Sequence, residues 1–192
     1  MTYWNDFNNA EEQNNYDLIP NGTIAKVRLI IRPGGYDDMA QGWTGGYATL
    51  ADAGAVYLNV EYAVLEGKYT RRKLWGIIGL YSPKGPEWAN MGITFIKAMI
   101  NSARKLSPKD VSEKAVAARY VDKFSDIDGI EFIARIDITK DQHGKEKNEI
   151  KVAITPDHKD YAAMMNINTT PPEHNNTLHI PATTNQNRPS WA

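Results

Sequence analysis

Apolar and polar side chains alternate with a period of two along residues 23–32, TIAKVRLIIR. This alternation is the pattern of a β-strand that buries one face in a core. The apolar face holds Thr23, Ala25, Val27, Leu29 and Ile31, and the opposite face holds Ile24, Lys26, Arg28, Ile30 and Arg32. The segment therefore predicts a strand with one side in a core and a basic surface on the other.

A β-hairpin is predicted from residue 56 to residue 80. Residues 56–67 form its first strand, Glu66, Gly67 and Lys68 its turn, and residues 69–80 its second strand. The second strand is apolar on both faces, so the sequence leaves open whether Trp75 points inward or outward. The predicted core side of the first strand holds Val56, Leu58, Val60, Tyr62 and Val64.

The remaining segments predict two helices, two strands and a long loop. Pro86 suits the first turn of a helix, and a second helix is predicted from about Ser107 to Val121. Residues 129–139 and 148–155 alternate as strands, separated by a polar turn. Residues 33–54 contain six glycines, which favours a long loop over a helix.

The resulting order is strand, long loop, strand, strand, helix, strand, strand. A five-stranded barrel of the OB type has this order and binds oligonucleotides or sugars on an open face and two long loops. Other small antiparallel sheets with one helix share it, so the pattern predicts a mainly β fold with helices and favours an OB-like barrel. We expect an acidic, polar arm over residues 1–18, one domain over 19–163 and a disordered Asn-, Thr- and Pro-rich tail over 164–192.

Composition narrows the environment of the protein. The chain has 192 residues and no cysteine, which excludes disulfides and thiolate metal sites and predicts a reducing, intracellular compartment. It has no run of about 18 apolar residues, so we expect no membrane partner. The net charge of −1 is unevenly spread, because residues 1–18 carry four acidic residues and no Lys or Arg.

The predicted hairpin has an unusual mixture of side chains. Residues 65–81, LEGKYTRRKLWGIIGLY, interleave four cations with three large aromatic residues. Burial alone does not require such a mixture. Single-stranded nucleic acid offers a line of phosphates and exposed base faces, and proteins bind it with a cationic groove and aromatic platforms.

Four segments resemble a known family. IPNGTIAKVRLIIRPGG, YLNVEYAVLEGKYTRRKLWGIIGL, WANMGITFIKAMINSA and DIDGIEFIARIDITKD, spread between about Asp17 and Tyr161, are similar to small bacteriophage and prophage proteins related to phage single-stranded-DNA-binding proteins. The resemblance implies an OB-type fold and the handling of single-stranded DNA in replication or recombination, in the cytoplasm of a bacterial host. The C-terminal RPSWA departs from the acidic tail by which many bacterial single-strand binders recruit partners.

Thirteen residues are the predicted nucleic-acid contacts. Phosphates are expected to bind Lys26, Arg28, Arg32, Lys68, Arg71, Arg72 and Lys73, and bases to stack on Trp43, Tyr47, Tyr57, Tyr69, Trp75 and Tyr81. The glycines of residues 33–54 would let that loop close as a flap. Plainer interpretations stay open: the aromatic residues as core or rim, and the cations as guards of a sheet edge or an ordinary solvated face.

Catalysis has no positive signal. The four histidines are scattered, and the chain contains neither a Gly-x-Ser-x-Gly elbow nor a phosphate-binding loop. We therefore expect no enzyme activity, no metal and no cofactor. The expected partners are single-stranded DNA, with RNA open, further copies of the chain, and phage replication or recombination proteins. The alternatives are a structural or protein-interaction module of a phage or mobile element, and a carbohydrate-binding barrel.

Overall fold

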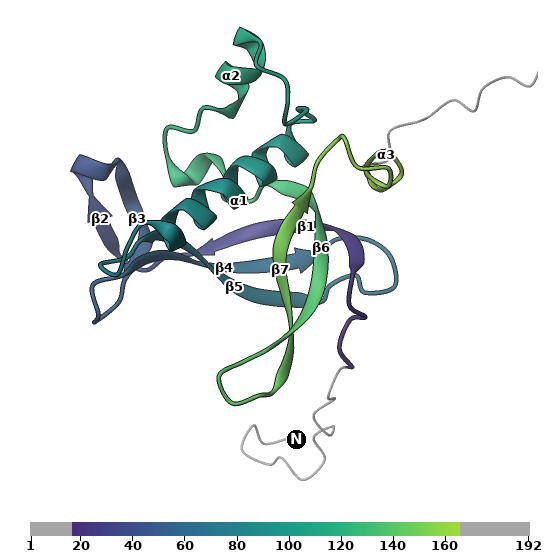
Figure 1. Cartoon of the computed structure of the whole chain (residues 1–192), viewed down its shortest axis with the longest axis horizontal. Coiled ribbons are helices and arrows are strands. Elements are labelled where there is room, and N and C mark those ends of the chain that lie inside the picture. Colours follow the sequence, from purple (N-terminus) through teal and green to yellow (C-terminus); the bar gives the residue numbers. More distant parts are fainter. Residues whose placement is uncertain (1–16, 166–192) are drawn as a thin grey trace, which may run out of the picture.

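Seven antiparallel strands form one open sheet accompanied by three α-helices in the computed structural model, which describes residues 17–165 (Figure 1). The prediction of a mainly β fold with helices is confirmed. The strands are β1 (Thr23–Arg32), β2 (Tyr36–Asp38), β3 (Trp43–Leu50), β4 (Val56–Val64), β5 (Lys73–Tyr81), β6 (Glu131–Lys140) and β7 (Glu146–Ile154). The helices are α1 (Glu87–Ala103), α2 (Glu113–Arg119) and α3 (Tyr161–Met164), with 3-10 turns at Met39–Gln41 and Phe124–Asp126.

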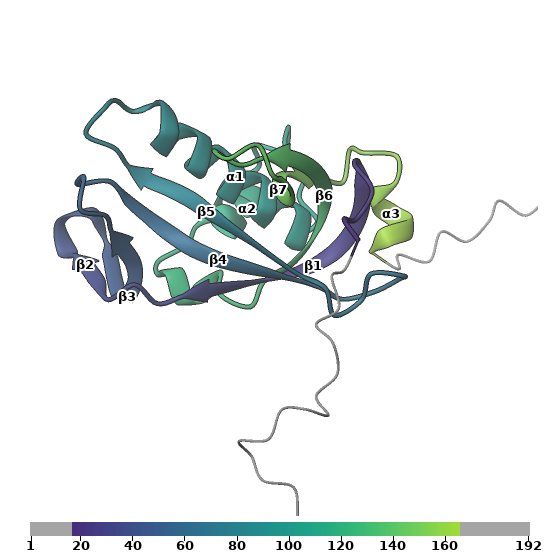
Figure 2. The ribbon, with the colours of Figure 1, turned by 90° about the horizontal axis from the view of Figure 1, so that it is seen from below.

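Strand β1 joins the two halves of the sheet. Its residues Val27–Arg32 pair with β4, and its residues Thr23–Arg28 pair with β6 on the other side. β5 pairs with β4, and β7 pairs with β6. Figure 1 shows the β6–β7 hairpin crossing β4 and β5 at a steep angle. Figure 2 shows β1, β4 and β5 as one layer, with α1 and α2 to one side.

The faces of β1 and β4 that the sequence predicted to be buried do lie in the core. Ala25, Val27, Leu29 and Ile31 are buried, as are the five residues predicted for the core side of the 56–64 strand. Tyr62, Phe95 and Phe132 form a cluster of edge-to-face rings with centroids 6.2–6.5 Å apart. Such clusters add to the stability that apolar burial provides.

Helix α1 follows Pro86 as predicted and packs closely against β5. A Cβ on Gly92 of α1 would lie 1.9 Å from the carbonyl oxygen of Gly79 in β5, so only glycine fits at this approach. Met99 and Ile100, near the end of the helix, are buried in the core. The helix thus packs against β5 and also contacts β7.

The predicted long loop over residues 33–54 is wrong, because most of this segment forms the hairpin of β2 and β3. Tyr36 pairs with Ala48, and Asp38 pairs with Trp43. Asp38 caps the intervening 3-10 turn by accepting from the amide of Ala40, and Gly42 ends the turn at φ 74°. Glycine thus serves at a left-handed turn position here, which is a use that composition alone does not reveal.

Two predicted boundaries also shift. The connection after β4 is longer than a tight turn, so Tyr69, Arg71 and Arg72 lie in a loop and not in β5. The second helix begins at Glu113 with Ser112 as its N-cap, because Ser107 and Asp110 accept local backbone hydrogen bonds in turns.

Met164, placed in the predicted tail, belongs to α3; the rest of that tail and most of the N-terminal arm lie outside the described residues. Among residues 17–165, no helix is long and apolar enough to cross a membrane.

Candidate nucleic-acid interface

The register of β1, β4 and β5 places three rows of three residues on the outer face of the sheet, opposite the core. Paired residues on neighbouring antiparallel strands point to the same side, so each row is a set of neighbouring side chains. We call this array the outer face. Its rows are Arg28, Ala63 and Lys73; Ile30, Glu61 and Trp75; and Arg32, Asn59 and Ile77.

Trp75 points outward. Its relative exposure is 61%, and that of Ile77, two residues along the same strand, is 58%. The structure thus settles the orientation that the sequence left open. Two large apolar side chains next to each other on a solvated strand face form a platform that the core of this chain does not use.

Glu61 is a buried carboxylate between two cations of the outer face. Its relative exposure is 1%, and Lys73 Nζ lies 2.9 Å from its Oε1 while Arg32 pairs with its Oε2. The ammonium group of Lys73, followed by the guanidinium of Arg32, lowers the pKa of Glu61 below its ordinary value. Sequence reasoning missed this residue, because its only signal was an acidic side chain at an outward position of an apolar strand.

The cations of β1 are engaged with carboxylates. Arg28 lies 2.6 Å from Glu131 of β6, and Lys26 lies 3.2 Å from the same residue and 3.6 Å from Glu66. The hydrogen bond from Arg28 is the main cause of the lowered pKa of Glu131. Partly exposed ion pairs of this kind are worth little, so a phosphate could exchange for a carboxylate at modest cost.

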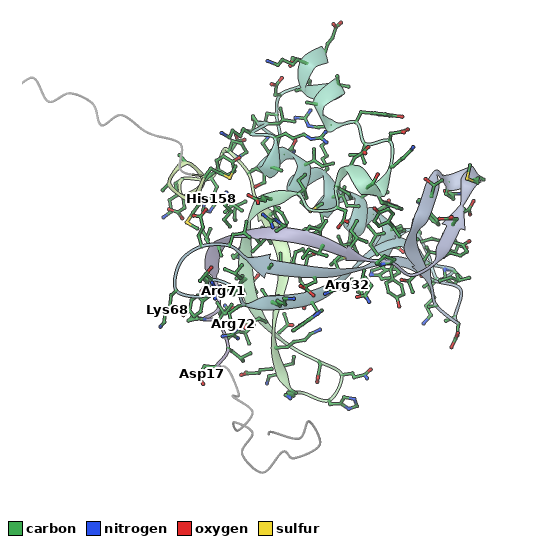
Figure 3. The ribbon with its side chains drawn as sticks, turned by 180° about the vertical axis from the view of Figure 1, so that it is seen from behind. Asp17, Arg32, Lys68, Arg71, Arg72 and His158 are labelled. Carbon is green, nitrogen blue, oxygen red and sulfur yellow. The ribbon has the colours of Figure 1, made fainter. Side chains whose placement is uncertain are left out.

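The β4–β5 loop gathers the other predicted cations. Figure 3 shows Lys68, Arg71 and Arg72 close together near Asp17, whereas Arg32 lies farther along the sheet. Arg72 donates a hydrogen bond of 3.0 Å to the backbone oxygen of Asp17. Arg71 is exposed and holds a left-handed backbone with φ 67°, which is unfavourable for a residue with a Cβ.

Most of the other predicted stacking residues are partly packed. Tyr69 lies against the core, with Lys68 Nζ 5.5 Å from its ring centroid. Tyr47 also packs against the core, and the ring of Tyr57 contacts that of Trp88 at 6.3 Å between centroids. Trp75 is 61% exposed and Tyr81 is 50% exposed, so these two rings present the larger free surfaces.

The structure does not bring all thirteen predicted residues together. Trp43 and Tyr47 lie on the β2–β3 hairpin, which adjoins the Val56 end of β4, and the β4–β5 loop follows the Val64 end. Figure 1 shows the two at opposite ends of the layer. Trp43 and Tyr47 therefore lie far from the cations of the β4–β5 loop, whereas Lys73, Trp75 and Arg32 share one surface.

Two cavities lie along the line where β5 and β7 contact each other, and together we call them the groove. Neither strand pairs with a further described strand on the side that faces the other. One cavity of about 330 Å³ lies between α1, β5 and β7, lined mainly by apolar side chains such as Ile77, Trp88 and Met91. A second cavity, of about 300 Å³, is lined by Leu18, Arg72, Lys73, Trp75, Lys147 and Asn148, among others. The groove is apolar at one end and cationic at the other.

Neither a family model nor a curated protein matches the chain. Within the described residues 17–165, no three His, Cys, Asp or Glu side chains gather as metal ligands would. Function must therefore be argued from the outer face and the groove themselves.

Proposed function

We propose that the protein binds single-stranded DNA without reading its sequence, through the outer face and the β4–β5 loop. The observation that carries this proposal is the exposed ring of Trp75, which lies on the same face as Lys73 and Arg32. A flat ring next to cations offers both contacts that a single strand needs, a stacking surface for a base and a charge for the adjoining phosphate.

The topology supports assignment to the OB type. Its five main strands follow the path β5-β4-β1-β6-β7, with α1 inserted between β5 and β6 in the chain. The β2–β3 hairpin takes the place of the first long loop, and the β6–β7 turn that of the second. In such barrels ligands bind over the second and third main strands, which here are β4 and β5.

The ion pairs reduce the number of phosphates that we expect the protein to neutralise. Arg28, Arg32 and Lys73 are paired with Glu131 or Glu61, whereas Lys68 and Arg71 form no ion pair with a described carboxylate. Each phosphate bound by a single strand changes the logarithmic salt slope by about −0.7. Two to four contacts would give a slope of roughly −1.5 to −3.

Fluorescence polarisation with labelled dT oligomers tests the proposal directly. We expect binding that weakens with salt and exceeds binding to duplex of the same length. The double variant Lys68→Glu and Arg71→Glu should bind far less while keeping its circular dichroism and melting temperature. A folded protein that ignores dT oligomers in dilute buffer would overturn the proposal, and equal binding of rU oligomers would extend it to RNA.

A protein-interaction module is the second candidate, favoured by the exposed apolar side chains around the groove. Ile77, Tyr81 and Met91 are all at least half exposed. This candidate predicts indifference to oligonucleotides and retention of a protein partner at high salt.

A role in the replication or recombination of a phage or mobile element belongs to the first proposal and rests on the resemblance of the sequence alone. A sugar-binding barrel would use Trp75 but would not need the cations.

A further inference from the structure

We infer that the groove between β5 and β7 is the docking site of the chain's own N-terminal residues 1–16, which then compete with other ligands of the outer face. The docking rests on the groove and on the sequence of this segment. Only its consequence, competition with single-stranded DNA, rests on the proposed function.

The groove offers an extended segment two kinds of contact, cationic at one end and apolar at the other. β5 and β7 contact each other and α1 packs against β5, so the segment would lie over the groove and bind through its side chains, not as an added strand. Arg72, Lys73 and Lys147 line one cavity, which makes that end cationic although Glu146 also lines it. The other cavity, lined by Ile77, Trp88 and Met91, has room for an aromatic side chain at about 330 Å³.

Residues 1–16, MTYWNDFNNAEEQNNY, complement that groove in charge and in apolar content. They contain three acidic residues and no Lys or Arg, and they contain four aromatic residues. The acidic residues are Asp6, Glu11 and Glu12, and the aromatic residues are Tyr3, Trp4, Phe7 and Tyr16. Single-stranded DNA would present phosphates to the same cations and base rings to the same apolar surface.

The segment enters the described structure at the groove itself. Asp17, the next residue, accepts a hydrogen bond from Arg72 through its backbone oxygen at 3.0 Å, and Leu18 lines the cationic cavity. Sixteen residues span up to about 50 Å when extended, whereas the nine residues of β5 cover roughly 30 Å. The arm is therefore long enough to reach every part of the groove from its point of attachment.

Attachment makes a weak contact effective. A tethered segment is present at its own site at an effective concentration in the millimolar range. An arm that binds the groove only weakly would thus occupy it much of the time and raise the apparent Kd of a competing oligonucleotide several-fold. Trp75 and Lys73 line the groove and also belong to the outer face, so the two ligands cannot both occupy them.

The test uses the full chain with Asp6→Asn, Glu11→Gln and Glu12→Gln. Its control is a full chain with Asp52→Asn, Glu113→Gln and Asp122→Asn, which changes net charge equally at exposed positions outside the groove. First, a labelled peptide of residues 1–16 is titrated against the arm variant without nucleic acid. We expect salt-sensitive binding that Lys73→Glu and Lys147→Glu in the same background weaken. Second, we expect dT affinity to rise about three- to tenfold in the arm variant and to stay near wild type in the control.

The outcomes separate the two proposals. No binding of the peptide, or an equal gain of dT affinity in both variants, would overturn the docking. Peptide binding in a protein that never binds dT would uphold the docking and reject the nucleic-acid function. Sedimentation that shows wild-type dimers lost in the arm variant would place the arm on a second copy and overturn docking within one chain.

Discussion

The ammonium nitrogen of Lys73 lies 2.9 Å from Oε1 of Glu61, so a buried carboxylate holds the cation next to the exposed ring of Trp75. Arg32 pairs with the other oxygen of the same carboxylate. Glu61 therefore organises the outer face and at the same time competes with phosphates for two of its cations.

Glu61→Gln is expected to change stability and affinity in opposite directions. The free energy of unfolding should fall by about 1 to 3 kcal/mol, because charge-assisted hydrogen bonds to a buried group are lost. Affinity for dT oligomers should rise, because Arg32 and Lys73 lose their counter-charge. Urea unfolding and polarisation measure the two effects, with Glu113→Gln as the exposed control outside the outer face. Parallel losses of stability and affinity would contradict this role.

Trp75→Ala tests the stacking platform. The side chain is 61% exposed, so we expect the free energy of unfolding to change by less than about 1 kcal/mol. Affinity should fall about 5- to 150-fold, corresponding to about 1 to 3 kcal/mol for one stacked base. Trp75→Phe should keep most of the affinity. Tyr57→Ala is the contrast, since loss of the contact with Trp88 should lower stability.

Arg71→Gly tests the binding role of the Arg71 side chain apart from the strain of its left-handed backbone. Glycine relieves the left-handed conformation at φ 67°, so stability should stay constant or rise by up to about 1 kcal/mol. Affinity for dT should nevertheless fall, and the salt slope should shrink by about 0.7. Lys105→Gly is the matched control, because Lys105 has φ 57° and is exposed outside the outer face. Unchanged dT binding by Arg71→Gly would remove this residue from the interface.

Stability should depend on acid through Glu61 and Glu131. The pKa of each is lower in the folded chain than its ordinary value of 4.5, through the ion pair with Lys73 for Glu61 and the hydrogen bond from Arg28 for Glu131. Their contribution is thus complete above that value and is lost as pH falls through the lower folded pKa. The urea midpoint of unfolding is measured for wild type and Glu61→Gln from pH 7 to pH 3. We expect the difference between the two midpoints to shrink as the pH falls. A constant difference would show that the charge of Glu61 is not what stabilises the fold.

Gly92→Ala tests how closely α1 approaches β5. The new Cβ would lie 1.9 Å from the Gly79 carbonyl oxygen, and backbone has to move to make room. We expect a loss of about 1 to 3 kcal/mol from overpacking, despite the higher helix propensity of alanine. Thermal or urea unfolding measures it, with the exposed Thr94→Ala in the same helix as control. A neutral Gly92→Ala would mean that the helix can shift away from the strand.

Local periodicity was sufficient for the five main strands β1, β4, β5, β6 and β7 and for the long helix α1. The alternation in residues 23–32 predicted which side of β1 is buried, because successive strand residues point to opposite faces whatever the neighbours are. The β2–β3 hairpin escaped prediction because the same glycines suit both a loop and left-handed turn positions such as Gly42. Only pairing partners distinguish the two, and these lie across the hairpin.

The sequence by itself determined the presence of the five main strands, the basic side of β1 and the concentration of cations and rings before and within β5, since these depend on neighbours along the chain. Only the tertiary structure decided that Trp75 is exposed, that Glu61 is buried between Arg32 and Lys73, and that a groove runs between β5 and β7. Those features arise from strand register and from the curvature that brings distant strands together. Neither quantity is encoded in any one local segment.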